Sequence, residues 1–327
     1  MDRDRGTNAL PVTIITGFLG SGKTTLLNRL LRDPRLADTA VIVNEFGAVG
    51  LDHLLMAPAI EDAVLLANGC VCCTVRGDIA DTLEMLWERR EAGAMPQFAR
   101  IVIETTGLAD PAPVAHALLA GPEQRFACRL DGIVATLDAL HAPGQFARQA
   151  EARAQVAAAD MLVLTKTDLA SAGEIAAAED AACAINPLAP IVHAVAGAID
   201  PARLFGIARG TGWLADPAPA RGHVRFRHGY AIAATVLRRA APVAWERLSL
   251  WLDSLLSLHG ERVLRVKGIA RVAGVARPVV LHAVHHVPHP PEVLDRADAP
   301  LGTRIVVIAR GLPEAGIRAS FAAAMGD

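Results

Sequence analysis

The chain has 327 residues, of which 52% are hydrophobic and 20% charged, and its formal net charge is −2. This composition excludes a disordered chain, and the near-neutral charge provides no basic field for nucleic acid or an anionic membrane. No apolar run approaches the ~20 residues of a membrane span, and the charged N-terminus has no apolar signal region after it, so we expect a cytoplasmic protein that binds neither nucleic acid nor membrane.

Short apolar segments alternate with helical patterns along the first two hundred residues. Strands are predicted at residues 11–16, 40–44, 100–104, 132–137, 161–164 and 191–195. Helices are predicted at residues 24–32, 78–90, 148–159 and 172–185. Nearly continuous apolar strands that alternate with helices are typical of a parallel sheet covered on both faces. We therefore expect an α/β domain with helices on both faces of a parallel sheet at residues 1–205.

The pattern changes near residue 206. Residues 206–222 are rich in Gly, Ala and Pro and are interpreted as a linker. After it, strands are predicted at 223–226, 230–237, 263–266, 270–272, 279–287 and 304–309, and helices at 242–259 and after Pro313. These elements predict a smaller C-terminal α+β domain at residues 223–327.

Residues 17–24 read Gly-Phe-Leu-Gly-Ser-Gly-Lys-Thr and fit the P-loop pattern, between a strand that ends at Thr16 and a helix that begins at Thr24. In such a loop, glycines let backbone N–H groups converge on phosphate oxygens at the start of a helix. Lys23 would reach the β- and γ-phosphates, and the Thr24 hydroxyl would bind Mg²⁺. The motif makes the α/β domain at residues 1–205 one of the P-loop NTPase kind. The predicted nucleotide-binding residues here are Gly17, Gly20, Ser21, Gly22, Lys23, Thr24 and Thr25.

An acidic residue ends the apolar strand at residues 100–104. Glu104 would hold Mg²⁺ through water or orient the attacking water, so we expect it to be catalytic together with Lys23 and Thr24. The backbone N–H of Gly107 would bind the γ-phosphate, which makes residues 105–110 a segment that senses hydrolysis.

Residues 165–168 read Thr-Lys-Thr-Asp after a buried strand. The Asp168 carboxylate can accept two hydrogen bonds from guanine N1 and N2, while the Lys166 stem packs over the ring. Adenine lacks these donors, so the segment favours GTP over ATP. The usual first residue of the pattern is Asn, and Thr165 leaves guanine selectivity open at that position.

Lysine is rare in this chain, since only three of its 32 basic residues are lysines. Lys23 and Lys166 lie in the two nucleotide segments, where a planar guanidinium does not replace a thin-stemmed ammonium. The third is Lys267, for which the sequence indicates no chemistry.

Three of the five cysteines, Cys70, Cys72 and Cys73, lie within four residues. Thiolates suit Zn²⁺ and other soft or borderline divalent metals, and three sulfurs leave one tetrahedral position open for exchange. Because adjacent Cys72 and Cys73 would point opposite ways in a strand, we expect a turn here. Two alternatives stay open, namely buried apolar cysteines and a thiol redox switch.

This ordered set of motifs resembles that of the CobW-type metallochaperones, P-loop GTPases related to the urease and hydrogenase nickel-insertion proteins. The resemblance implies GTP hydrolysis with Mg²⁺, slow for the chain alone, and a Zn²⁺ or Co²⁺ site at the three cysteines that is coupled to nucleotide state. It implies that Glu45 is a switch carboxylate near Mg²⁺ and the thiols, that zinc is delivered to a client metalloprotein, and that a nucleotide- or metal-dependent homodimer is possible. The resembling segments are residues 16–28, 44–47, 68–77, 104–113 and 165–168, and more loosely 265–268 and 284–287.

Two other functions are weighed against this one. A P-loop small-molecule kinase would prefer ATP, and a GTP-linked thiol redox regulator would form a disulfide within residues 70–73. A histidine cluster in the C-terminal domain leaves a second metal site open, although His282 and His286 would share one strand face while His285 faces away. The cluster comprises His282, His285, His286 and His289.

Overall fold

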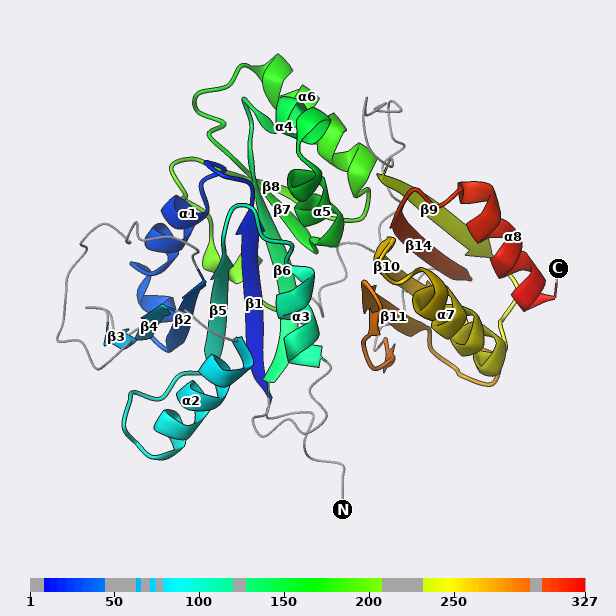
Figure 1. The fold of residues 1–327 in the computed structure, drawn as a ribbon, viewed down its shortest axis with the longest axis horizontal. Helices are drawn as coiled ribbons and strands as arrows, with labels where there is room; N and C mark the ends of the chain where they lie inside the picture. The colour runs from blue at the N-terminus through cyan, green and yellow to red at the C-terminus, as the bar shows by residue number, and fades with distance from the viewer. Residues whose placement is uncertain are drawn as a thin grey trace. The chain divides into compact units, whose positions relative to one another are not determined.

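The computed structural model describes residues 9–44, 63–65, 71–74, 79–119, 128–207, 232–294 and 302–326. The chain divides into two units (Figure 1). The first comprises Met1–Pro143, Ala159–Glu179 and Pro190–Gly210, and the second comprises Gly144–Ala158, Asp180–Ala189 and Thr211–Asp327. The linker predicted at residues 206–222 stays a prediction, because residues 208–231 lie outside the described part of the chain.

An eight-stranded sheet forms the first unit, in the order β3-β4-β2-β5-β1-β6-β7-β8. Only β3 runs antiparallel to its neighbour, β4, and the other neighbouring strands are parallel. The predicted parallel α/β sheet is therefore confirmed. Its strands are β1 (Leu10–Gly17), β2 (Thr39–Asn44), β3 (Ala63–Leu65), β4 (Val71–Thr74), β5 (Arg100–Thr105), β6 (Cys128–Asp138), β7 (Met161–Thr165) and β8 (Ile191–Ala194).

The helices between these strands differ from the prediction at two places. The helix expected at 148–159 is α5, and neither α3 nor α4, which precedes it, is predicted by the sequence patterns. Both α3 and α4 have prolines at or near the first turn. These prolines interrupt the helical pattern in the sequence, although proline is tolerated at the start of a helix. The helical elements are α1 (Lys23–Leu30), η1 (Pro34–Leu36), α2 (Ile79–Glu91), α3 (Ala112–Leu119), α4 (Ala142–Arg148), α5 (Ala150–Ala158), α6 (Ala172–Ile185) and η2 (Pro201–Arg203).

Both faces of the central strand β1 are buried. Adjacent residues of a strand point to opposite faces, yet Ile14 and Ile15 of β1 are both almost fully buried. On the Ile15 face, Leu26 and Leu27 of α1 join one apolar cluster with the strands. The central strand is thus held rigidly, and the loops at its carboxyl end are positioned by a packed core.

The C-terminal part of the second unit is an antiparallel sheet with two helices, as the predicted α+β domain requires. The unit also includes Gly144–Ala158 and Asp180–Ala189, which the sequence predicts in the first domain. Of the strand expected at 270–272, only Ala270 lies in a strand, the longer β10, and Val272 forms an isolated bridge with Val243. The strand expected at 279–287 is broken after Val284. The strand expected at 223–226 lies outside the described residues. The elements are β9 (Ile232–Arg239), α7 (Trp245–His259), β10 (Val263–Ala270), β11 (Val279–Val284), β12 (Val287–Pro288), β13 (Glu292–Val293), β14 (Thr303–Arg310) and α8 (Glu314–Met325).

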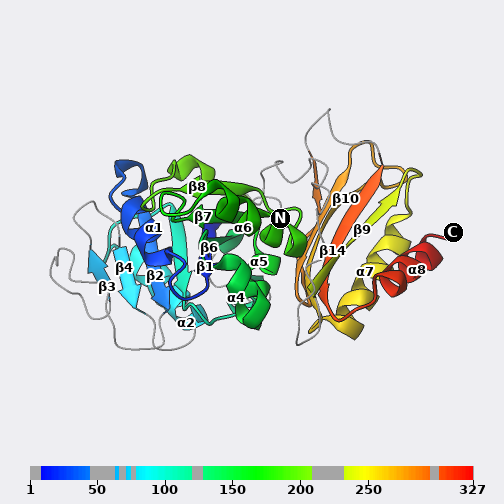
Figure 2. The ribbon, with the colours of Figure 1, turned by 90° about the horizontal axis from the view of Figure 1, so that it is seen from above.

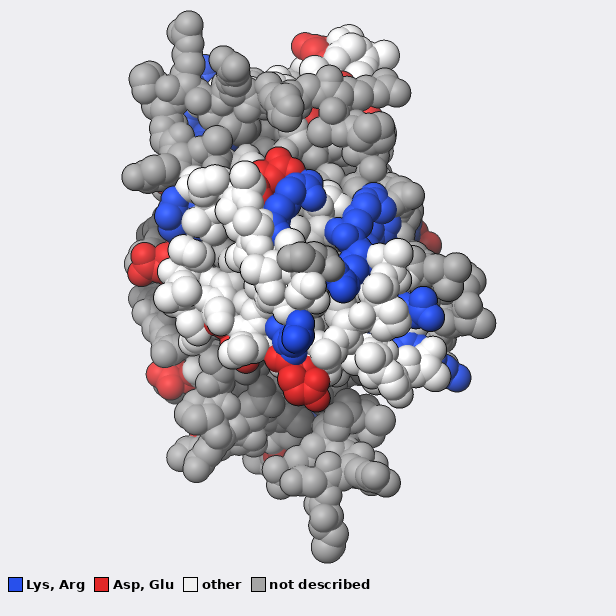
Figure 3. All heavy atoms as spheres, turned by 90° about the vertical axis from the view of Figure 1, so that its right-hand side faces the viewer, with Lys and Arg blue, Asp and Glu red and all other residues white. Residues whose placement is uncertain are grey.

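Helices α7 and α8 lie side by side on one face of this second sheet (Figure 2). Their contact includes Trp251 and Phe321, whose ring centroids are 5.0 Å apart in an edge-to-face arrangement. The outer side of α7 leaves Leu250 and Leu258 exposed. Figure 3 shows that the described surface on the right-hand side of Figure 1 is mostly uncharged, with Lys and Arg in separate groups and Asp or Glu beside some of them.

No helix in the described part of the chain combines the length and the apolar character needed to cross a membrane.

Candidate functional site

The P-loop connects the end of β1 at Gly17 with the start of α1 at Lys23. Glycine is required at Gly17, because a Cβ there would lie 2.3 Å from Oγ1 of Thr136 and 2.7 Å from Oγ of Ser21. Gly22 caps α1 with φ of 93°, a left-handed conformation that glycine adopts without strain. The loop is therefore shaped by glycines and ends at a helix N-terminus, as a phosphate-binding loop must.

Lys23 folds back over this loop. Its Nζ donates to the carbonyl oxygens of Gly17 at 2.8 Å and Phe18 at 3.3 Å, and the side chain is largely buried. An ammonium held above the loop lies where phosphate charge would be neutralised. The predicted phosphate-binding residues are thus brought together.

Thr24 and Glu104 meet at the carboxyl edge of the sheet. The Thr24 hydroxyl donates to Oε1 of Glu104 at 2.9 Å, and the Glu104 side chain is buried. Strand pairing explains the contact, because Glu104 of β5 lies opposite Ile15 of β1. A hydroxyl and a carboxylate are the hard oxygen donors that Mg²⁺ prefers, so this pair fits the Mg²⁺ ion predicted from the sequence.

Gly107 lies directly against the P-loop. A Cβ added at Gly107 would be 2.8 Å from the backbone nitrogen of Leu19 and 2.6 Å from its Cδ2. No larger residue fits there without a shift of the loop. The segment predicted to sense the γ-phosphate is consequently in contact with the loop that would bind it.

Residues 165–168, which are predicted to bind the guanine base, form the base segment. Thr165 connects this segment to the P-loop. Its buried hydroxyl lies 2.7 Å from the carbonyl oxygen of Ser21 and 2.9 Å from that of Leu137. These contacts give Thr165 a role in connecting β6, β7 and the P-loop. Lys166 follows with φ of 58°, and Asp168 is exposed in the adjoining turn.

A network of hydroxyl groups, missed from the sequence, lies beneath the P-loop. Ser21 and Thr136 are joined by a 2.6 Å hydrogen bond, and Thr105 donates to Oγ1 of Thr16 at 2.9 Å. Threonines are ordinary strand residues, so nothing in their local pattern distinguishes them.

Asp138 was also missed, although a signal for it was available. It ends β6 as Glu104 nearly ends β5, and its Oδ2 accepts a hydrogen bond from Nζ of Lys166 at 2.7 Å. Burial raises the pKa of this carboxyl, but the hydrogen bonds from Lys166, His141 and the Leu140 backbone outweigh burial and leave the pKa below its usual value. Asp138 is therefore an ionised partner of the base-segment lysine.

The cysteine segment is described only in part. Glu45 and Cys70 lie outside the described residues, and of Cys72 and Cys73 the structure describes the backbone alone. That backbone is strand β4, parallel to β2, with Cys72 opposite Val41 and Cys73 opposite Ile42. The turn expected at these two cysteines is therefore wrong, because Val71–Thr74 consists of residues that pair readily as a strand.

Histidines in the second unit do not follow the predicted face. The φ of 50° at His285 lies in the turn after β11, so His282 and His286 do not share one strand. The rings of His282 and His289 have centroids 5.8 Å apart. Within the described residues, no group of three or more His, Cys, Asp or Glu side chains could hold a metal ion.

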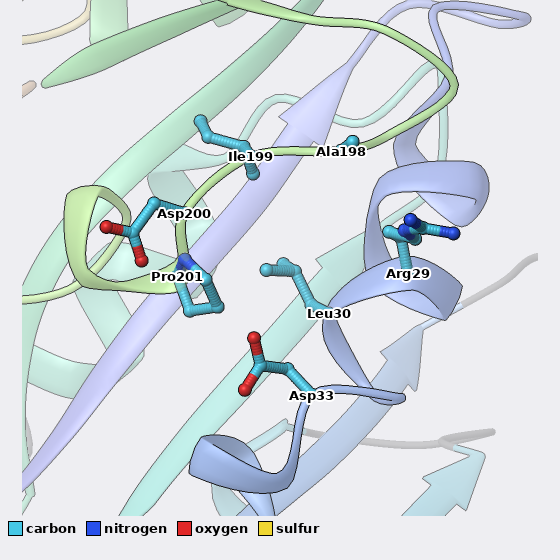
Figure 4. Close-up of a pocket in the computed structure, with 7 residues that line it drawn as sticks. All are labelled: Arg29, Leu30, Asp33, Ala198, Ile199, Asp200 and Pro201. Carbon is cyan, nitrogen blue, oxygen red and sulfur yellow. The ribbon is translucent and has the colours of Figure 1, made fainter.

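A separate pocket lies at the far end of α1 from the P-loop, where Leu30 points toward Pro201 (Figure 4). Arg35 forms ion pairs with Asp33 at 2.8 Å and Asp200 at 2.9 Å, so both acidic residues of the pocket already have a cation. None of the predicted nucleotide-binding residues lines it. The lining residues are Arg29, Leu30, Asp33, Ala198, Ile199, Asp200 and Pro201.

The glycine loop, the Thr24–Glu104 pair and the base segment at one sheet edge define a P-loop nucleotide-binding protein. Residues 11–193 match the CobW/HypB/UreG nucleotide-binding domain, and residues 232–325 match the C-terminal domain of the cobalamin synthesis protein CobW. The chain belongs to the CobW/HypB/UreG family, with the CobW type of C-terminal domain.

Relatives resemble the chain along nearly its whole length. The zinc chaperone YjiA of Escherichia coli is 34% identical over 96% of this chain and 98% of its own. The zinc chaperone CobW of a Sinorhizobium species is 32% identical over 96% of this chain and 97% of its own. The crystal structure of Zn(II)-bound YjiA GTPase from E. coli is 32% identical, covers 97% of this chain and 99% of its own, and superimposes with a TM-score of 0.76.

Proposed function

We propose that this chain is a GTP-hydrolysing metal chaperone that binds zinc and delivers it to a client metalloprotein. The observation that carries the proposal is the Thr24–Glu104 pair beside a P-loop whose lysine is already in place. Family membership supports it, as do the names of the relatives, which are zinc chaperones and zinc-regulated GTPases.

The P-loop and the base segment would divide the binding of GTP between them. Backbone N–H groups of the loop and Nζ of Lys23 bind the phosphates, while Lys166 and Asp168 select guanine. Thr24 and Glu104 would hold Mg²⁺, which when bound neutralises charge that develops on the phosphates during transfer. Glu104 orients the attacking water. We expect slow turnover for the chain alone, because such sites are accelerated by an arginine that a partner often supplies.

Zinc is the cargo, with Cys70, Cys72, Cys73 and Glu45 as its proposed ligands and Co²⁺ as an alternative ion. Support comes from strand order, because β2 lies between β4 and β5 and pairs with both. The chain segments that follow these three strands therefore leave the same edge of the sheet. GTP would fix the segments near Glu45 and Gly107, and hydrolysis would loosen them and release the metal.

We assign the choice of partner to the C-terminal domain at residues 223–327, beyond a linker at residues 206–222. The client is a metalloprotein that accepts zinc, and a homodimer that depends on nucleotide or metal would bring two such sites into one assembly. The compartment we expect is the cytoplasm, where GTP is supplied and thiols stay reduced.

Two measurements on the purified full chain test this function. In competition for binding, GTP should displace a labelled GDP far better than ATP does, and protein purified without chelator should contain zinc. Cys128→Ser serves as a control, because Cys128 is buried in β6 and burial raises its pKa to about 11. Preference for ATP, or a zinc content unaffected by Cys72→Ser and Cys73→Ser, would contradict the proposal.

The kinase alternative is not favoured by the relatives, whose names are those of zinc chaperones and GTPases. A redox regulator would instead give a chain without zinc and with a disulfide within residues 70–73 after mild oxidation. Measuring the zinc content of the purified chain therefore distinguishes a redox regulator from the proposed zinc chaperone.

A further inference from the structure

The geometry points to Asp138 as a positioning residue for nucleotide binding, which holds the ammonium of Lys166 so that the lysine stem is fixed against the base. This inference rests on the proposed function, because it concerns the base half of the proposed GTP site. It adds a residue that belongs to none of the recognised nucleotide motifs of the sequence.

Contacts other than the one with Lys166 hold the Asp138 side chain in place. It ends β6, lies opposite Thr165 of β7 and is 2% exposed. Its Oδ1 accepts a hydrogen bond from the backbone N–H of Leu140 at 2.9 Å, which orients the carboxyl group within its own loop. The other oxygen, Oδ2, is thereby directed to the Lys166 ammonium at 2.7 Å.

Lys166 needs such a partner because of where it lies. It begins a turn closed by a 3.0 Å hydrogen bond from the N–H of Leu169 to the carbonyl oxygen of Lys166, and its side chain is 36% exposed. A four-carbon stem at such a position has many rotamers, and ordering them on binding costs affinity. Anchoring the ammonium before the nucleotide arrives removes part of that cost, while Asp168 in the same turn remains available for the guanine edge.

A second group shares the same oxygen. Nδ1 of His141 lies 2.9 Å from Oδ2 of Asp138, but the His141 side chain is 65% exposed and follows β6, outside the base segment. The ammonium belongs to the predicted base-binding residue and the imidazole does not. The effect of Asp138 on the nucleotide should therefore pass through Lys166, which makes His141→Ala a matched control.

The test uses the full chain and two probes, GDP and inorganic tripolyphosphate, which engages the P-loop without a base. Asp138→Asn keeps the shape but loses the charge, and Lys166→Met keeps the stem but loses the ammonium. Each variant should weaken GDP binding by about tenfold and change tripolyphosphate binding by less than about twofold. The double variant should bind GDP no more weakly than either single variant does. His141→Ala should bind GDP within about twofold of the wild-type chain.

Several outcomes would overturn the inference. They are an equal loss of tripolyphosphate binding, additive effects in the double variant, unchanged GDP binding by Lys166→Met, or a loss in His141→Ala as large as in Asp138→Asn. If Asp138→Asn does not fold, Asp138→Ser takes its place, with the same expected loss of GDP binding and the same small change in tripolyphosphate binding. A wild-type chain that binds no GDP would overturn the proposed function together with this inference, whereas GDP binding with additive effects overturns the inference alone.

Discussion

Glu104 is the residue on which we expect GTP hydrolysis to depend most directly. It is buried, it accepts a hydrogen bond from Thr24, and it stands at the sheet edge beside the P-loop. Replacement by glutamine keeps the size of the side chain and removes its charge. Its effect should therefore fall on the chemical step more than on binding.

We predict that Glu104→Gln lowers kcat for GTP by about 100-fold, since a group that orients or deprotonates water contributes this order of rate. GTP affinity should change by less than about threefold, because the phosphates are bound mainly by the loop and Lys23. Phosphate release under single-turnover conditions measures the first quantity and calorimetry the second. Glu88→Gln, on the exposed side of α2, is the control and should leave both unchanged.

Thr165 shows how a departure from a motif is accommodated by its surroundings. A hydroxyl in this buried position reaches both the Ser21 carbonyl in the P-loop and the Leu137 carbonyl in β6. Thr165, which departs from the Asn usual in this pattern, thus connects the P-loop and the base segment through its hydrogen bonds.

We predict that Thr165→Val lowers the free energy of unfolding by about 1–3 kcal/mol, because a buried carbonyl loses its hydrogen-bond donor. GDP affinity should fall as well, since the P-loop loses an anchor. Thr165→Ser retains the hydroxyl and should restore GDP affinity. Urea denaturation and GDP titration are the measurements, and a valine variant as stable as the serine variant would show that the hydroxyl contributes nothing.

At the scale of elements, α7 illustrates a helix with one buried side. Leu248 is fully buried in the cluster that joins α7, α8 and the second sheet, whereas Leu258 on the same helix is 76% exposed. The two leucines have the same chemistry and the same helix propensity. They differ in burial.

We predict that Leu248→Ala lowers the free energy of unfolding by about 2–5 kcal/mol, through lost apolar contacts and a residual cavity. Leu258→Ala should change it by less than about 0.5 kcal/mol, as expected for an exposed site. Urea denaturation of the full chain, followed by circular dichroism, provides both values. Equal effects at the two positions would mean that α7 does not pack against the sheet as described.

The strand and helix predictions failed where proline or a turn interrupted a pattern. Pro143 and Gly144 obscure α4, although both lie in its first turn, and the turn at His285 divides one expected strand into β11 and β12. Apolar runs such as β7 were predicted closely, because a buried parallel strand has few other possible interpretations.

At the scale of the whole molecule, the proposed nucleotide and metal sites are related by strand order. β4, which includes Cys72 and Cys73, pairs with β2, and β2 pairs with β5, which ends one residue after Glu104. One sheet thus connects the strand of the cysteines to the strand of the proposed catalytic carboxylate.

We predict that zinc binds more tightly when a non-hydrolysable GTP analogue is present than when GDP is present. A difference of about tenfold is typical of coupling between two sites. Competition with a zinc-chelating dye measures it, and the double variant Cys72→Ser, Cys73→Ser should lose both the affinity and the nucleotide dependence. Equal zinc affinity in the two nucleotide states would show that zinc binding does not depend on the bound nucleotide, and would contradict this prediction.

The sequence by itself determined the chemistry of the strand ends and the class of the fold. A glycine loop before a lysine, an acidic strand end and a Thr-Lys-Thr-Asp segment are local patterns, and local spacing is sufficient to recognise them. The tertiary structure alone decided which of these groups touch. The Thr24–Glu104, Asp138–Lys166 and Thr165–Ser21 contacts join residues 80, 28 and 144 positions apart. Such contacts follow from strand order and register, which no local pattern of residues contains.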